Sequence, residues 1–116
     1  MALRFSSWYP LAPDAIEANA PEAAGVYEVR VYGPLLAYPK GRSAMVLYGA
    51  TGDHAQTLRK ALRVLSERGL PAAARSAVGS HQVYFRTAAA QRPHEELRRR
   101  LADFQMRFGA HPIGNA

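Results

Sequence analysis

Two segments with strand-like alternation, followed directly by a segment with helical periodicity, constrain the fold of this chain most strongly. In GVYEVRVY (25–32), apolar or aromatic residues alternate with polar ones, the two-residue period of a half-buried strand. AMVLYGA (44–50) predicts a second strand, joined to the first as a hairpin by a long loop, 32–43. In 53–68, apolar residues recur every three or four positions, which predicts a helix with one buried stripe.

The remaining elements are expected on both sides of this unit. A short helix is predicted at Pro13–Asn19, a third strand at 81–87, and a last helix that begins near Pro93 and ends before Gly109. Residues 72–80 are small and are expected to form a loop. The order is helix, two strands, helix, strand, helix, which predicts an α+β fold with a three-stranded antiparallel sheet flanked by helices.

Length and composition narrow the possible classes of protein. The chain has 116 residues, about half of them hydrophobic, so we expect one domain over 1–116. It has no cysteine, which excludes disulfides and thiolate metal sites. No run approaches the roughly 20 apolar residues of a membrane helix. We therefore expect a cytoplasmic protein with no membrane contact.

The positive charge is concentrated in the later part of the sequence. The formal net charge is +6, and residues 40–116 hold thirteen of the fifteen basic residues but only five of the nine acidic ones. Such a field attracts polyanions, so nucleic acid is the expected partner, although a solvated basic surface has the same composition. Lys40 and Arg42 in the long loop and Lys60 on the first long helix are candidate contacts. DNA is expected in preference to RNA.

Two short motifs add a resemblance. Gly25-Val26-Tyr27 and Leu47-Tyr48-Gly49, with a helix directly after the second, resemble the two halves of the GIY-YIG nuclease signature, and the similarity extends over about 21–115. The resemblance implies the same small antiparallel sheet. It also implies that Tyr27 lies beside the scissile phosphate and that Tyr48 positions water or substrate. Because a phenol has a high ordinary pKa, a nearby cation would have to assist it as a base.

The resemblance also implies an arginine on the helix after the second motif, to stabilise charge that develops on phosphate. Its position is occupied by Ala61 in this chain. Arg59 and Arg63 are the candidate replacements. Each helical residue turns by about 100°, so neither side chain leaves the helix in the same direction as residue 61.

A metal-binding glutamate on the last helix is the final implied element, with Mg²⁺ or Mn²⁺ as cofactor of an active enzyme. Counting back from Pro112 and Asn115, which resemble the family's closing residues, leads to Asp103; Glu96 is the other candidate carboxylate. Asn115 is also a candidate nucleic-acid contact. The alternative for the acidic residues is helical ion pairing, with Glu96 spaced to pair with Arg100.

Three hypotheses follow. The first is a nucleic-acid-binding GIY-YIG-like domain whose phosphodiester hydrolysis is altered or lost. The second is an active, divergent, metal-dependent endonuclease, which requires a cation and a carboxylate close to Tyr27. The third is a protein-interaction module that uses exposed apolar residues: Trp8, Tyr9, Leu35, Leu36 and Tyr38. The sequence specifies neither a protein partner nor an oligomeric state.

Overall fold

A computed structural model of the chain describes residues 3–52 and 56–116. Its main sheet is antiparallel and has the strand order β1-β6-β2-β5. The four strands are β1 (Tyr9–Pro10), β2 (Gly25–Val31), β5 (Met45–Ala50) and β6 (Val83–Ala89). A separate hairpin consists of β3 (Leu36–Tyr38) and β4 (Gly41–Ser43). The helices are α1 (Pro13–Asn19), α2 (Leu58–Arg68), α3 (Ala72–Val78) and α4 (Pro93–Phe108), followed by the 3₁₀ turn η1 (Ile113–Asn115).

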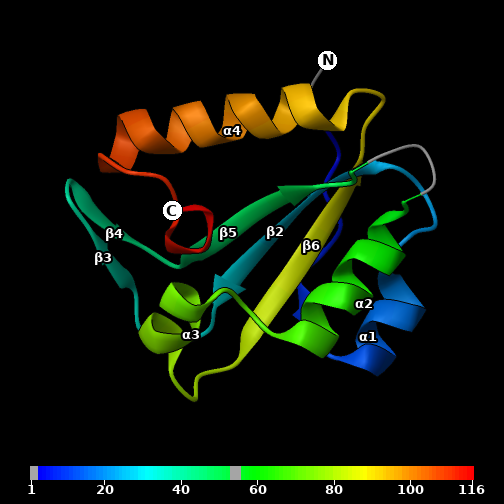
Figure 1. The fold of residues 1–116 in the computed structure, drawn as a ribbon, viewed down its shortest axis with the longest axis horizontal. Helices are drawn as coiled ribbons and strands as arrows, with labels where there is room; N and C mark the ends of the chain where they lie inside the picture. The colour runs from blue at the N-terminus through cyan, green and yellow to red at the C-terminus, as the bar shows by residue number, and fades with distance from the viewer. Residues whose placement is uncertain (1–2, 53–55) are drawn as a thin grey trace.

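The helices lie on both sides of the sheet. Figure 1 shows α4 along one side and α1 and α2 together on the other, with η1 beside β5. The hairpin β3–β4 projects next to the end of α4, and the backbone N–H of Lys40 donates to the carbonyl of Phe108. The expected α+β class is therefore confirmed.

The strand register decides which side chains share a face. Val29 of β2 lies opposite Leu47 and Phe85, and these three are buried together with Ile16 of α1 and Leu62 of α2. We call this the apolar face. It contains most of the buried aliphatic and aromatic side chains, and their removal from water is the main stabilising contribution on this side.

The other side of the sheet is polar, and we call it the α4 face. Glu28 of β2 lies opposite Tyr48 of β5 and Arg86 of β6. The alternation in the sequence predicts a half-buried strand with Glu28 in solvent, and this is wrong, because only 1% of Glu28 is exposed. Here α4 and the N-terminal segment cover the face that a two-residue period predicts to be exposed to solvent.

Three further expectations are corrected. The main sheet has a fourth strand, because Tyr9 and Pro10 pair with Phe85 and Tyr84. The expected loop 32–43 contains the hairpin β3–β4. The expected loop 72–80 contains α3, whose Ala74 and Val78 are buried in the core. Short alanine-rich segments lack a clear apolar stripe, so packing rather than pattern determines this helix.

The predicted helix boundaries agree closely elsewhere. The α1 bounds match the prediction, and α4 begins at Pro93 and ends before Gly109, which adopts a left-handed φ of 83°. The α2 helix begins at Leu58, with the Thr57 side chain as its N-cap. The predicted start of that helix, at 53–55, lies outside the described residues. No helix in 3–52 or 56–116 has the length and apolar character needed to span a bilayer.

Candidate functional site

The two signature tyrosines lie on opposite faces of the sheet. Tyr27 is paired across the strands with Gly49, and Tyr48 with Glu28, so adjacent positions point to different sides. The Tyr27 ring covers Gly49, where an added Cβ atom would lie 2.1 Å from Tyr27 Cζ. Burial raises the pKa of Tyr27 above its ordinary value. The resemblance placed both tyrosines at one site, and the described geometry does not bring them together.

Tyr27 borders a cavity of about 340 Å³ whose walls come mainly from α2 and the turn after it. Val64, Leu65 and Leu70 give this cavity an apolar lining, and Arg68 supplies its cation. No acidic residue of the described chain lines it. Of the two groups that the nuclease hypothesis requires near Tyr27, the described residues of this cavity therefore supply a cation but no carboxylate.

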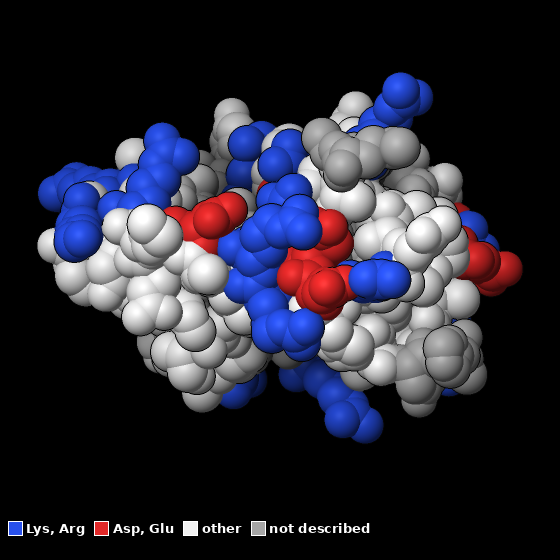
Figure 2. All heavy atoms as spheres, turned by 90° about the horizontal axis from the view of Figure 1, so that it is seen from above, with Lys and Arg blue, Asp and Glu red and all other residues white. Residues whose placement is uncertain are grey.

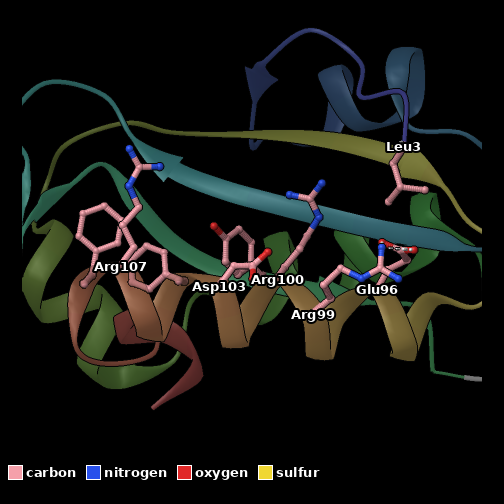
Figure 3. Close-up of a pocket in the computed structure, with 9 residues that line it drawn as sticks. Leu3, Glu96, Arg99, Arg100, Asp103 and Arg107 are labelled. Carbon is pink, nitrogen blue, oxygen red and sulfur yellow. Dashed lines mark hydrogen bonds and ion pairs between the residues drawn. The ribbon is translucent and has the colours of Figure 1, made fainter. Parts of the chain in front are cut away.

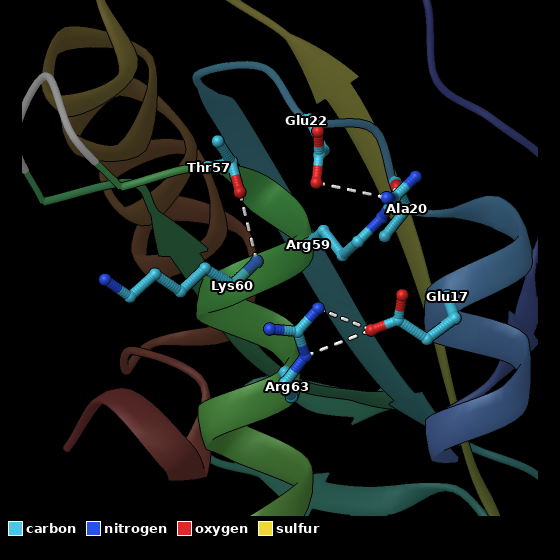
Figure 4. Close-up of polar contacts among 7 residues, drawn as sticks. All are labelled: Glu17, Ala20, Glu22, Thr57, Arg59, Lys60 and Arg63. Carbon is cyan, nitrogen blue, oxygen red and sulfur yellow. Dashed lines mark hydrogen bonds and ion pairs between the residues drawn. The ribbon is translucent and has the colours of Figure 1, made fainter.

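The two candidate catalytic arginines connect helices instead. Arg63 Nε donates to Glu17 of α1 at 3.0 Å, and Arg59 bonds both the carbonyl of Ala20 and the carboxylate of Glu22. Figure 4 shows both guanidinium groups directed toward α1, whereas Lys60 points to the other side of α2. Through these contacts, Arg59 and Arg63 connect α2 to the segment that contains α1.

Tyr48 borders a different cavity, of about 320 Å³, between the sheet and α4. Its walls contain three kinds of side chain from successive turns of α4, as Figure 3 shows. The lining residues are the aromatic Tyr48, Phe104 and Phe108, the basic Arg99, Arg100 and Arg107, the acidic Glu96 and Asp103, and Leu3. Unlike the Tyr27 cavity, this cavity is lined by a signature tyrosine, by cations and by carboxylates. We call it the Tyr48 cavity.

The Tyr48 phenol is held neutral. Burial and the negative charge of Glu28 raise its pKa to about 12, and Arg100 and Arg86 oppose this change only in part. Its ring meets Phe104 edge to face, with the ring centres 5.9 Å apart. At neutral pH the group is therefore a hydrogen-bond donor set in an aromatic wall, and not a base.

Behind the Tyr48 cavity, Glu28 binds two arginines. Its carboxylate accepts from Arg86 Nε at 2.8 Å and from Arg100 Nη1 at 2.6 Å. Phe5 of the N-terminal segment lies over both guanidinium groups, at 4.5 Å from Arg86 Cζ and 4.3 Å from Arg100 Cζ. Trp8 lies over Arg86 as well. The N-terminal segment thus shields this ion cluster from water and anchors α4 to the sheet.

Asn115 contacts the backbone of the site. Its side-chain oxygen accepts from the N–H of Tyr48 at 2.9 Å, and its side-chain nitrogen donates to the Tyr48 carbonyl at 2.8 Å. The neighbouring Gly114 packs closely on Leu47, to whose Cβ an added Cβ atom would lie 2.6 Å. The candidate nucleic-acid contact Asn115 therefore has its amide occupied and holds η1 against β5.

The surface around α4 is predominantly basic. Figure 2 shows Lys and Arg side chains gathered at one end of this surface and in a band across its middle, with carboxylates between them. Lys40 and Arg42 are exposed on the β3–β4 hairpin, and Arg98, Arg99 and Arg107 on α4. We call these five residues the basic surface. Two of them, Lys40 and Arg42, are among the nucleic-acid contacts predicted from the sequence.

The candidate metal ligands line the same cavity but do not form a cluster. Glu96 and Asp103 are two helical turns apart, and Glu96 is paired with Arg99 at 3.3 Å. Among the described residues, no three acidic or histidine side chains come together in a way that could hold a metal ion. The predicted pairing of Glu96 with Arg100 is wrong, because Arg100 is bound to Glu28.

Most residues proposed for a protein-interaction module are engaged inside the molecule. The Arg30 guanidinium lies over the Trp8 ring, Tyr9 contacts Phe85 with tilted rings, and Tyr38 meets Phe104 edge to face. Leu36 is packed against the core. Leu35 is the member that is largely exposed.

Comparisons with known protein families, curated proteins and solved structures found no match to this chain. The site therefore has to be interpreted from its own geometry.

Sequence reasoning missed the cations and aromatic rings that line the Tyr48 cavity. Their signal is present in the sequence: the lining residues 96, 99, 100, 103, 104, 107 and 108 follow the three- and four-residue spacing of one helical face. From the sequence alone, Phe104 and Phe108 indicate no more than an apolar stripe, and three adjacent arginines do not by themselves indicate one helical face.

Proposed function

We propose that this protein binds nucleic acid through the basic surface and has no hydrolytic role. The observation that carries the proposal is that Lys40, Arg42, Arg98 and Arg107 are exposed and have no ion-pair partner within 3–52 and 56–116. The basic residues of α2 that face α1 are instead neutralised by Glu17 and Glu22.

Unpaired cations on one surface favour a polyanion. Each phosphate that contacts Lys or Arg releases condensed counterions, and this release gives binding that weakens steeply with salt. Arginine also presents a fork of donors that matches two phosphate oxygens. The hairpin and the last turns of α4 adjoin through Lys40 and Phe108, so their cations can act on one backbone.

The separation of the two tyrosines supports binding without cleavage. Tyr27 has no carboxylate of the described chain in its cavity, and the candidate catalytic arginines Arg59 and Arg63 are paired with acidic residues. Tyr48 stays protonated up to strongly alkaline pH. Neither signature tyrosine is therefore a general base at neutral pH, and Tyr27 lacks the nearby carboxylate that the endonuclease hypothesis requires.

The test is fluorescence anisotropy of labelled DNA and RNA oligonucleotides over a series of salt concentrations. We expect binding that is tighter for DNA than for RNA, with no cleavage in Mg²⁺ or Mn²⁺. The Arg107→Ala variant should bind all sequences more weakly and lower the salt slope by about one. Arg75→Ala removes an exposed arginine of α3, away from α4, and is the matched control.

Two outcomes would contradict the proposal. Equal loss of affinity in the Arg107→Ala and Arg75→Ala variants would show that net charge alone drives binding. Metal-dependent cleavage that is lost in Tyr27→Phe would instead support the divergent endonuclease.

A further inference from the structure

We infer that the Tyr48 cavity receives an unpaired nucleobase, so that the protein selects single-stranded over duplex nucleic acid. This inference rests on the proposed function and specifies its ligand. It is carried by the way in which charge, aromatic surface and hydrogen-bonding groups are distributed within the cavity.

The charge distribution excludes a phosphate from the middle of the cavity. Asp103 projects from α4 between the turns that carry Arg99 and Arg107, as Figure 3 shows, and Glu96 lies one turn before Arg99. An anion placed at the centre would meet these carboxylates. A neutral group there would avoid repulsion by the carboxylates, and the phosphates on either side of it could pair with Arg99 and Arg107.

The aromatic lining suits a flat ring. Tyr48, Phe104 and Phe108 form a continuous group, with ring centres 5.9 Å apart for the first pair and 4.5 Å apart for the second. Aromatic side chains are the usual platform for bases of single strands, because every base has a π face. At about 320 Å³ the cavity lies near the lower limit of small-molecule sites, roughly 300–1,000 Å³. A base inside a duplex cannot reach such a site without leaving its stack.

The polar groups indicate which bases fit. Asp103 has no ion-pair partner among the described residues, and its carboxylate only accepts hydrogen bonds. A carboxylate is the natural acceptor for the exocyclic amino group of cytosine. The protonated phenol of Tyr48 can donate a hydrogen bond to a ring nitrogen or a carbonyl oxygen of the base. We therefore expect a preference for oligo(dC) over oligo(dT), which lacks the amino group.

The experiment compares four labelled ligands of equal length by anisotropy at one salt concentration. They are oligo(dC), oligo(dT), a strand of abasic sugar phosphates, and a duplex. The abasic strand keeps every phosphate and removes every base. We expect oligo(dC) to bind about tenfold more tightly than the abasic strand, as the loss of one stacked base predicts. The duplex should resemble the abasic strand.

Two variants connect this effect to the cavity. Tyr48→Leu should reduce oligo(dC) binding to the abasic level and leave abasic binding unchanged. Asp103→Asn changes one exposed atom, keeps the fold, and should bring the ratio of oligo(dC) to oligo(dT) affinity close to one. Gln105→Ala is the control, because Gln105 is exposed on α4, carries no charge and does not line the cavity.

The outcomes separate the two proposals. Equal affinity for oligo(dC), the abasic strand and the duplex would overturn the nucleobase site and leave nucleic-acid binding in place. No binding to any ligand would overturn both. A base-dependent affinity that neither Tyr48→Leu nor Asp103→Asn reduces would remove the assignment to this cavity.

Discussion

The two faces of the central sheet are covered in different ways. The apolar face packs Val29, Leu47 and Phe85 against α1, α2 and α3, and none of these three side chains carries a polar group. The α4 face places Glu28 between two arginines and closes this cluster with aromatic rings. The same strand, β2, serves both faces through alternate residues. The comparison teaches that one side of the sheet is held by apolar burial, whereas the other is held by charged and aromatic groups together.

The difference between the faces also applies to their arginines. On α2, Arg59 and Arg63 are paired with acidic residues of the chain segment that contains α1. On α4, Arg100 points inward to Glu28, whereas Arg98 and Arg107 are exposed. The number of arginines therefore overstates the charge that is free to meet a ligand on both sides, and on α4 the arginines without an ion pair among the described residues are Arg98 and Arg107.

The largest expected effect comes from removal of the charge at the centre of the α4 face. Glu28→Gln leaves Arg86 and Arg100 without a counter-charge beneath α4. We expect the free energy of unfolding to fall by about 3 kcal/mol, at the lower end for broken buried ion pairs because both arginines are partly exposed. Urea unfolding measures the change.

The matched control for that substitution is Glu17→Gln, which makes the same chemical change in an exposed pair with Arg63. Its cost should stay below about 1 kcal/mol. Similar losses in the two variants would remove the distinction between a buried ion cluster and a surface pair.

The second prediction concerns the titration of the two signature tyrosines. The pKa of Tyr48 is raised to about 12 from 10.0, so the folded state holds this proton more tightly than the unfolded state. Its contribution to stability is therefore complete below pH 10 and is lost as the pH rises from about 10 to 12. Ring-labelled tyrosine NMR measures both titrations.

Glu28→Gln sharpens this comparison between faces. It removes the negative charge that raises the pKa of Tyr48, so that pKa should fall. The pKa of Tyr27 is raised by burial alone and should stay where it is. A parallel shift of both tyrosines would show that the substitution loosens the whole sheet rather than one face.

A smaller effect is expected from the aromatic cover of the ion cluster. Phe5→Ala removes the ring that lies over Arg86 and Arg100 and should lower the free energy of unfolding by about 1–2 kcal/mol. Phe5→Leu keeps much of the apolar contact and loses the ring. An equal cost for both variants would point to the cation–π contacts, and full retention of stability in Phe5→Leu would point to simple burial.

The smallest effect is expected on α2. Arg63→Ala breaks a pair whose side chains are 47% and 54% exposed, and the free energy of unfolding should change by about 0.5 kcal/mol or less. Its affinity for nucleic acid should equal that of the unchanged protein, because the side chain faces α1. A loss of affinity equal to that of Arg107→Ala would extend the basic surface to α2.

Periodic apolar residues predicted the elements that have one buried side. The apolar stripes of α2 and α4 and the alternation in β2 and β6 were sufficient to predict these elements, because burial of one face leaves a regular pattern. The helix α3 was missed because its Ala74 and Val78 are too few to show a period. The burial of Glu28 was not predicted, because the alternation within β2 does not show that a second layer covers its polar face.

The candidate site was predicted in part. Tyr48, Glu96 and Asp103 were named from the sequence and line one cavity. The separation of Tyr27 from them follows from strand register, which a motif does not contain. The partners of Arg59, Arg63 and Arg100 lie more than 30 residues away in the chain, so no local spacing rule could find them.

The contact between Asn115 and Tyr48 has a consequence for how this protein behaves at high concentration. β5 is the last strand in the sheet order, and an outermost strand offers unpaired N–H and carbonyl groups to a neighbouring chain. The carboxamide of Asn115 takes up both backbone groups of Tyr48, as the next strand would. Gly114 lets η1 approach Leu47 closely enough to lie along this edge. Asn115 and Gly114 thus cover the edge of β5, where a strand of another chain would otherwise pair.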